Sequence, residues 1–230
     1  MDAKDKIIVA LDLDSLMKAK PLIEDLAEYV GCFKVGLDLL TAEGAHQVVT
    51  FVHALRGKVF FDGKFDDIPN TVGGAAKMVA QLGVSMFNVH ASAGIEAMMA
   101  AVANKGQSLV LAVTILTSLE ENNAHLIFGG PSKAKVLQLA RDAKIAGCDG
   151  IICSPQELEL LGKQKELRGL LKVTPGIRSS NSLPDDQKRT MSASEAIKAG
   201  ADYLVIGRPI TQALDPVLAA KRISEEITIL

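Results

Sequence analysis

The chain has 230 residues, which fits one domain and lies within the roughly 200–250 residues of barrels built from alternating strands and helices. Apolar residues make up 48% of the sequence, aromatic residues 4%, and tryptophan is absent, so we expect a core of Val, Ile, Leu and Ala. A net charge of −2 with no long basic run argues against general nucleic-acid binding, which needs a positive surface.

Other sequence features bear on the cellular compartment. No apolar stretch reaches the roughly 18 residues that a membrane-spanning helix needs. The first residues, MDAKDKIIVALD, contain an apolar run that is too short and too acidic for a secretory signal. Cys32, Cys148 and Cys153 are odd in number and form no CxxC pair, which argues against a disulfide framework or a zinc site. We therefore expect a soluble cytoplasmic protein with reduced, partly buried thiols.

Short apolar runs alternate with amphipathic stretches along the chain, as they do where parallel strands are covered on both faces. We expect eight strands, at residues 6–11, 33–36, 59–62, 86–90, 109–114, 150–153, 171–174 and 203–207. Helices are expected between them, among them residues 16–29, 44–55, 71–82, 95–104, 133–146 and 193–199.

The joints between these elements favour a closed (β/α)8 barrel, a TIM barrel, in which residues 1–230 form a single domain. Glycine follows four of the helices, at positions 31, 83, 147 and 200, and glycine ends helices because it adopts positive φ readily. The repeat AGxD links helix to strand at residues 146–149 and 199–202. The alternative is an open doubly wound sheet, but its usual GxGxxG turn is missing after the first strand.

The third expected strand ends in the strongest chemical signal. Asp62 and Lys64 are two residues apart, so both face the barrel mouth, where active sites of such barrels lie, and Asp67 follows in the loop. The second strand carries Lys34, and the first ends in Asp12. Unpaired charge is costly in a barrel interior, so we expect the two lysines to be neutralised by Asp62 and Asp67 and to stay charged. The alternative is a solvated ion pair at a strand end.

A second cluster follows the last two strands. They run into TPGIR at residues 174–178 and IGRPI at 206–210, and barrel enzymes often bind phosphate with these loops. Arg178 and Arg208 offer the planar fork that suits an oxyanion, unless they are ordinary surface arginines. Between them, residues 179–190 are polar and are interpreted either as a lid over the phosphate or as a linker.

Several blocks together point to one family. Residues 62–72 have the sequence DGKFDDIPNTV, and residues 174–178 have TPGIR. Further blocks are ALD at 10–12, FKVG at 33–36, NVHA at 88–91, LTS at 116–118 and VIGRPI at 205–210. In this order, and over essentially the whole chain, they resemble the orotidine 5′-phosphate decarboxylases. The DxKxxD core alone is shared with related phosphosugar barrels, whereas DIPNTV and TPGIR are more specific.

The resemblance implies an enzyme that converts orotidine 5′-phosphate to uridine 5′-phosphate and CO₂, the last step of de novo UMP synthesis, with no cofactor and no metal. Lys34, Asp62, Lys64 and Asp67 would form the catalytic network, in which Lys64 stabilises and protonates a carbanion-like C6. The resemblance also implies a homodimer, with Asp67, Ile68 and Thr71 reaching the site of the partner subunit.

The same resemblance assigns the substrate-binding residues. Asp12 and Lys34 would hold the ribose hydroxyls, and Thr117 would meet the pyrimidine edge. Pro175 would pack near the base. The phosphate would be bound by four residues, of which Gln187 lies on the closing lid: Arg178, Gln187, Gly207 and Arg208.

Two positions depart from the family pattern. A larger apolar residue is expected where Gly63 stands, so strand three is expected to be looser, with Gly63 facing the helices. Asp66 adds negative charge beside the network and affects the pKa values there. His90 is interpreted as structural, and the four histidines are not spaced as metal ligands.

Two alternatives remain open at this point. One is a magnesium-dependent phosphosugar lyase on the same barrel, like the 3-keto-gulonate 6-phosphate decarboxylases, against which DIPNTV and Thr117 argue. The other is a catalytically silent barrel that only binds nucleotides, which the intact lysines and aspartates make unattractive.

Overall fold

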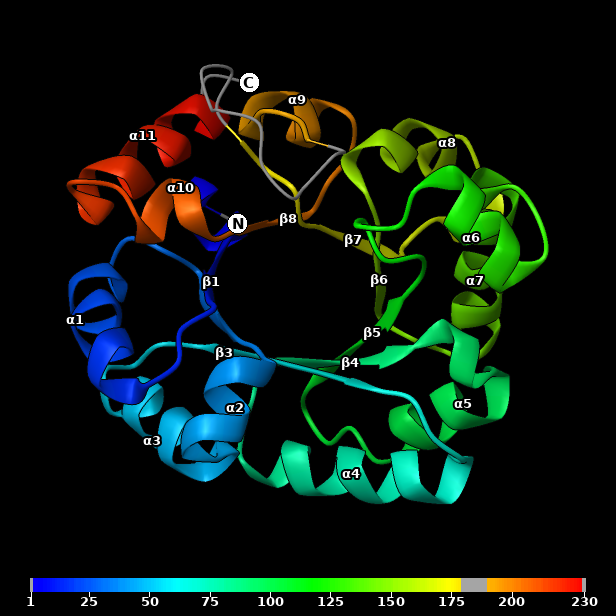
Figure 1. The fold of residues 1–230 in the computed structure, drawn as a ribbon, viewed down its shortest axis with the longest axis horizontal. Coiled ribbons are helices and arrows are strands. Elements are labelled where there is room, and N and C mark those ends of the chain that lie inside the picture. Colours follow the sequence, from blue (N-terminus) through cyan, green and yellow to red (C-terminus); the bar gives the residue numbers. More distant parts are fainter. Residues whose placement is uncertain (1, 179–189, 229–230) are drawn as a thin grey trace.

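Eight parallel strands close into a barrel (Figure 1) in the computed structural model, which describes residues 2–178 and 190–228. Each strand pairs with the next in sequence, and β8 pairs with β1, so the barrel prediction is confirmed and the open sheet is wrong. The strands are β1 (Ile7–Leu11), β2 (Cys32–Val35), β3 (Val59–Phe65), β4 (Met86–His90), β5 (Leu109–Val113), β6 (Gly150–Ile152), β7 (Leu171–Thr174) and β8 (Tyr203–Ile206).

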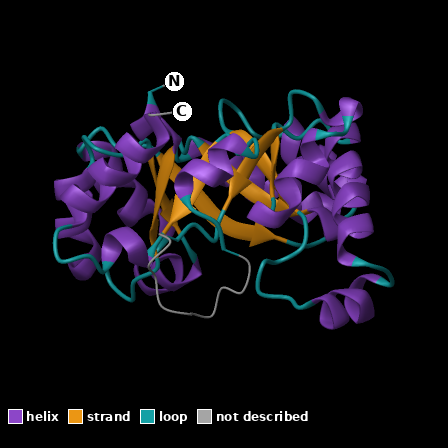
Figure 2. Ribbon diagram, turned by 90° about the horizontal axis from the view of Figure 1, so that it is seen from above, coloured by secondary structure: helices purple, strands orange, loops and turns teal. Residues whose placement is uncertain are grey.

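Helices surround the strands (Figures 1 and 2). The expected ones are α1 (Leu16–Leu26), α3 (Ala45–Ala54), α4 (Pro69–Gln81), α5 (Ile95–Ala103), α7 (Ser132–Ile145) and α9 (Ala193–Lys198). Five more were not among those expected, and four of them are short: α2 (Leu37–Glu43), α6 (Glu121–Phe128), α8 (Leu158–Gly162), α10 (Arg208–Thr211) and α11 (Pro216–Thr228). None of the described helices is long and apolar enough to span a membrane.

Most element ends lie within two residues of the expected ones, but two differ by more. Helix α1 ends at Leu26, three residues earlier than expected. Strand β3 continues to Phe65, three residues beyond the expected end, because pairing with β4 resumes at Phe65 after an irregularity. Strand β3 therefore carries Asp62 and Lys64 within it rather than at its end.

The apolar residues form two cores, and these explain why certain polar residues lie at the mouth. The larger core fills the space between the strands and the helices. The smaller core fills the barrel interior with Ile8, Ala10, Cys32, Phe60, Met86, Leu111, Val173 and Val205. Side chains two apart on a strand share a face. Lys34 and Asp62 follow Cys32 and Phe60 by two, so they continue the inward face toward the carboxyl ends of the strands.

The thiols are structural rather than reactive. Cys32, Cys148 and Cys153 are all buried and free, as expected from the sequence. Burial raises the pKa of each thiol to about 12, so none is a thiolate at neutral pH.

Candidate active site

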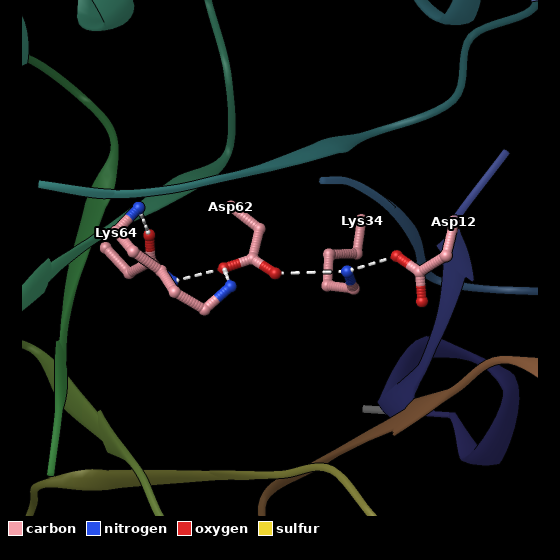
Figure 3. Close-up of polar contacts among 5 residues, drawn as sticks. Asp12, Lys34, Asp62 and Lys64 are labelled. Carbon is pink, nitrogen blue, oxygen red and sulfur yellow. Dashed lines mark hydrogen bonds and ion pairs between the residues drawn. The ribbon is translucent and has the colours of Figure 1, made fainter. Parts of the chain in front are cut away.

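Four charged side chains, on β2, on β3 and just after β1, form an alternating row at the barrel mouth (Figure 3). Lys34 Nζ lies 2.7 Å from Asp12 Oδ1 and 3.0 Å from Asp62 Oδ2. The other oxygen of Asp62 lies 2.7 Å from Lys64 Nζ. Each charge thus has an opposite charge as its neighbour, and one carboxylate joins the two lysines.

Burial distinguishes this row from an ordinary surface ion pair. The side chain of Asp62 is 7% exposed and that of Lys34 12%, whereas Lys64 is 31% exposed. Burial alone would lower the pKa of Lys34, but the carboxylates of Asp62 and Asp12 outweigh it and raise that pKa. Burial alone would raise the pKa of Asp62, but Lys34 and Lys64 outweigh it and lower that pKa. Both groups therefore stay charged at neutral pH, and the solvated-pair alternative is wrong for Asp62.

Lys64 has an unusual backbone. Its φ is +48°, in the left-handed region that costs a non-glycine residue about 1–2 kcal/mol. The register between β3 and β4 shifts between Phe61 and Phe65, so Lys64 lies in a local irregularity of the strand. At this irregularity the Lys64 N–H donates to a side chain, Oδ1 of Asn88, at 2.7 Å.

Asn88 is the residue that the sequence reasoning missed. It is fully buried on β4, and its Nδ2 donates to Asp62 Oδ1 at 2.6 Å. Its inward position follows from its place two residues after Met86, but its partners depend on the register between β3 and β4. The signal that the sequence offered was a single amide residue within an otherwise apolar strand.

The departure at Gly63 has a local explanation. A Cβ at this position would lie far inside van der Waals distance of the Phe61 ring, and close to the ring of Phe65 as well. The Phe61 and Phe65 centroids are 5.9 Å apart, and both rings belong to the core between strands and helices. Gly63 therefore faces the helix layer as expected, and the Phe61 ring fills the space that a larger residue would occupy.

A pocket of about 490 Å³ opens at the mouth, within the size range of small-ligand sites. It brings together both sequence clusters, which lie more than a hundred residues apart in the chain. The expected residues that line it are Asp12, Lys34, Asp62, Lys64, Thr117, Pro175, Arg178, Gly207 and Arg208.

Three expected residues do not line this pocket within one chain. Asp67, Ile68 and Thr71 are exposed, and Asp67 Oδ1 accepts a hydrogen bond from the Ile68 N–H. The loop after Phe65 leaves the barrel before α4 begins at Pro69. The expectation that Asp67 joins the charged row is thus wrong for a single chain, and the row is extended at its other end, where Asp12 lies next to Lys34. Gln187 lies outside the described residues.

The pocket also contains residues for which no role was expected. Several are apolar, such as Phe60 and Ile152. Thr211 ends α10, a helix that was not expected, and Gln212 follows it. His90 is partly buried, and burial lowers its pKa even though Asp66 and Asp62 oppose this. No group of three or more metal-ligating side chains occurs in the part of the chain that the structure describes.

Comparison with known proteins places the chain in a family. The family described as "Orotidine 5'-phosphate decarboxylase / HUMPS family" matches residues 5–223, nearly the whole chain. The chain belongs to this family. The orotidine 5'-phosphate decarboxylase of Moorella thermoacetica is 44% identical over 240 residues, which cover 99% of this chain and 94% of that protein. The protein of the same name from Geobacter sulfurreducens is 44% identical over 235 residues, covering 98% and 97%.

Solved structures of the orotidine 5'-phosphate decarboxylase family share this barrel. The enzyme from Lactobacillus acidophilus superposes with a TM-score of 0.83 at 34% identity, covering 96% of this chain and 98% of that one. The enzyme from Methanocaldococcus jannaschii, solved with the inhibitor BMP, gives a TM-score of 0.79 at 25% identity, with coverage of 96% and 98%. The family resemblance seen in the sequence is thereby confirmed.

Proposed function

We propose that this chain decarboxylates orotidine 5′-phosphate to uridine 5′-phosphate without a cofactor or a metal, as the last step of de novo UMP synthesis. The observation that carries the proposal is the Lys64 ammonium, held 2.7 Å from Asp62 in a pocket that also contains Arg178 and Arg208. A cation for the reacting carbon and two arginines for a phosphate thus share one cavity. The names of the relatives support the same reaction.

The chemistry needs a cation beside C6 of the pyrimidine. When the bond between C6 and the carboxylate breaks, the electron pair stays on C6 in the plane of the ring, and the ring offers no electron sink. Lys64 would stabilise this pair as an ammonium and then transfer a proton to C6, after which solvent restores the proton on the amine. CO₂ leaves as the neutral product.

Asp62 and Lys34 keep Lys64 ready for this step. Asp62 would lie beside the departing carboxylate, where its role is either to repel that group or mainly to orient Lys64. Its contacts with both lysines support the orienting role, because the same carboxylate fixes two ammonium groups. Lys34 and Asp12 would hold the ribose hydroxyls, Thr117 the pyrimidine edge, and Pro175 the base.

The phosphate end of the substrate is remote from the reacting bond. Arg178, Gly207 and Arg208 line the pocket there, and Arg guanidinium groups bind phosphate in a bidentate way. Together with Gln187, they would use the phosphate to close the site and exclude water. Binding energy from a remote group used in this manner raises the rate as well as the affinity.

The functional unit is proposed to be a homodimer of one-domain chains comprising residues 1–230. Asp67, Ile68 and Thr71 would complete the site of the partner subunit, and their exposure supports this, with Ile68 66% exposed. The buried free thiols fit a cytoplasmic protein, because thiols stay reduced in that compartment.

The direct test is the loss of orotidine 5′-phosphate absorbance after the protein is added in EDTA. Turnover at the same rate with and without EDTA supports the proposal. Turnover that EDTA abolishes and Mg²⁺ restores would contradict the metal-free reaction. Mg²⁺-dependent decarboxylation of 3-keto-gulonate 6-phosphate, with no turnover of orotidine 5′-phosphate, would favour the phosphosugar lyase. Tight binding of uridine 5′-phosphate without any turnover would indicate a silent nucleotide-binding barrel.

Lys64→Ala tests the role of the proton donor. We expect nearly all turnover to disappear, because removing a proton donor and a transition-state charge together costs several orders of magnitude in rate. Binding of uridine 5′-phosphate should survive, since the arginines at the phosphate end remain. A variant that keeps a tenth of the wild-type kcat would exclude Lys64 as the proton donor.

A further inference from the structure

The side chain of Asn88 touches the reacting groups without lining the pocket. It is 0% exposed on β4, on the face that continues from Met86 of the barrel interior. A polar group at such depth is retained when its hydrogen bonds are satisfied. The groups that the Asn88 amide binds therefore account for its presence at this buried position.

Both ends of the Asn88 amide bind groups of the charged row. Nδ2 donates to Asp62 Oδ1 at 2.6 Å, and Oδ1 accepts from the backbone N–H of Lys64 at 2.7 Å. An ionised carboxylate only accepts and a backbone N–H only donates, so the reversed amide would lose both bonds. The partners of Asn88 thus fix its orientation.

These two bonds constrain Lys64 at both of its ends. The backbone of Lys64 has a φ of +48° in an irregular part of β3, where Asn88 supplies the acceptor for its N–H. The ammonium binds Asp62 Oδ1, the same oxygen to which Asn88 donates. One amide therefore sets the distance between the base of the Lys64 side chain and the carboxylate that holds its tip.

We propose that Asn88 is a positioning residue that places the Lys64 ammonium against the reacting carbon by fixing both the Lys64 backbone and the Asp62 carboxylate. This inference rests on the proposed decarboxylation. Displacement of a reacting group by about 1 Å costs about a hundredfold in rate. Because Asn88 lies outside the pocket lining, its loss affects kcat far more than KM.

Two variants separate the two bonds. Asn88→Leu keeps the branched shape and the number of side-chain heavy atoms, although its methyl groups are larger, and it loses both hydrogen bonds. Asn88→Asp keeps an acceptor for the Lys64 N–H, but it cannot donate to Asp62 and places a second carboxylate beside it. We expect kcat to fall about 10- to 100-fold in Asn88→Leu and further in Asn88→Asp, while KM changes by less than about threefold.

The pH profile gives a second readout. Asp62 faces Lys34 from β2, Lys64 from β3 and the Asn88 amide from β4, with Asp12 beyond Lys34 and His90 within electrostatic reach. The hydrogen bond from Asn88 helps to lower the pKa of Asp62. Loss of this hydrogen bond raises the pKa of Asp62, so the acidic limb of kcat against pH moves to higher pH in both variants. A residue that only supports the fold would leave this limb in place.

Ser108→Ala is the matched control for loss of a buried hydrogen bond. Ser108 is 3% exposed, and its hydroxyl donates to the Val84 carbonyl at 2.6 Å, next to the start of β5 at the opposite end of the barrel. We expect a lower urea midpoint with unchanged kcat and pH profile.

The outcomes distinguish this inference from the proposed function. If the wild-type chain turns over and both Asn88 variants keep its kcat and its acidic limb, the inference is overturned and the function stands. If the wild-type chain shows no turnover, both are overturned. Should Asn88→Leu fail to fold, Asn88→Asp decides by the same kcat and pH readouts.

Discussion

Asp62 is the residue on which the charge balance of the pocket depends. One of its oxygens binds Lys34 and the other binds Lys64, while Asp12 lies on the far side of Lys34. Removing one partner of a buried ion pair leaves an uncompensated charge, which costs about 3–5 kcal/mol. The row is therefore interdependent, and single changes within it affect more than one group.

The ionisation of Asp62 predicts a pH dependence of stability. Its pKa in the folded chain lies below the ordinary value of 3.8, because Lys34 and Lys64 outweigh the effect of burial. The resulting stabilisation is present above that ordinary value and is lost as pH falls through the lowered pKa. Urea unfolding at pH 7, 4 and 3 should show the wild type losing more unfolding free energy than Asp62→Asn. Parallel curves for the two proteins would contradict this.

Arg208 offers a test of phosphate recognition. Charge-assisted hydrogen bonds contribute about 1.5–3 kcal/mol, so Arg208→Ala should weaken the binding of uridine 5′-phosphate by about 10- to 150-fold. Binding of uridine, which has no phosphate, should stay unchanged. Calorimetric titration of both ligands measures the difference, with Arg222→Ala on the exposed surface of α11 as a control that changes neither. Equal losses for the two ligands would place the phosphate elsewhere.

At the scale of elements, β3 combines regular packing with a local distortion. Its first residues pair with β4 in register, the pairing is then interrupted, and it resumes at Phe65. On the helix side, Phe61 packs over Gly63 against Phe65, whose ring in turn lies 6.0 Å from that of Phe87. The distortion that presents Lys64 to the pocket is thus supported by aromatic packing on the other face of the strand.

Gly63→Ala tests this packing. We expect a loss of about 1–3 kcal/mol in unfolding free energy, because the new methyl group overlaps the Phe61 ring. The double variant Gly63→Ala/Phe61→Leu should recover part of that loss, so the two changes will be non-additive in urea unfolding. Gly162→Ala on α8 is the control, since a Cβ there meets nothing within 4 Å, and it should be neutral or stabilising. Full additivity would show that Phe61 does not fill the Gly63 site.

At the scale of the molecule, the barrel gathers distant residues because all eight strands run in parallel. Their carboxyl ends meet at one mouth, so the charged row on the early strands shares one pocket with the arginines that follow the late strands. The same mouth leaves Asp67 and Ile68 exposed at its edge. The proposed dimer accounts for the exposure of Asp67 and Ile68, because both would contact the partner subunit.

Mixing two inactive variants tests the shared site. Lys64→Ala and Asp67→Ala chains should each have little activity alone. If Asp67 acts across the interface, a mixed dimer contains one intact site, and random pairing of equal amounts restores about a quarter of wild-type turnover. Turnover after co-refolding is the measurement, with each variant refolded alone as the control. Mixtures that stay inactive would assign Asp67 to the site of its own chain, and an Asp67→Ala chain that is active alone would assign it to no site.

The sequence by itself determined the barrel, the inward face of its strands and most of the pocket. Side chains two apart on a regular strand share a face, and active sites of such barrels lie at the carboxyl ends of the strands, so Lys34 and Asp62 were correctly expected at the mouth. The short helices were harder to predict, because a helix such as α10 has too few residues for a period to be recognised.

Only the tertiary structure decided which partners meet. The left-handed backbone of Lys64 and the two bonds of Asn88 depend on how β3 registers against β4, which no local pattern encodes. Asp67 lies outside the charged row, because the course of the chain after β3 carries it away from its own pocket, and Asp12 lies beside Lys34 at the other end of the row. Local patterns fix which face a side chain occupies, whereas contacts between neighbouring strands and loops require the packed barrel.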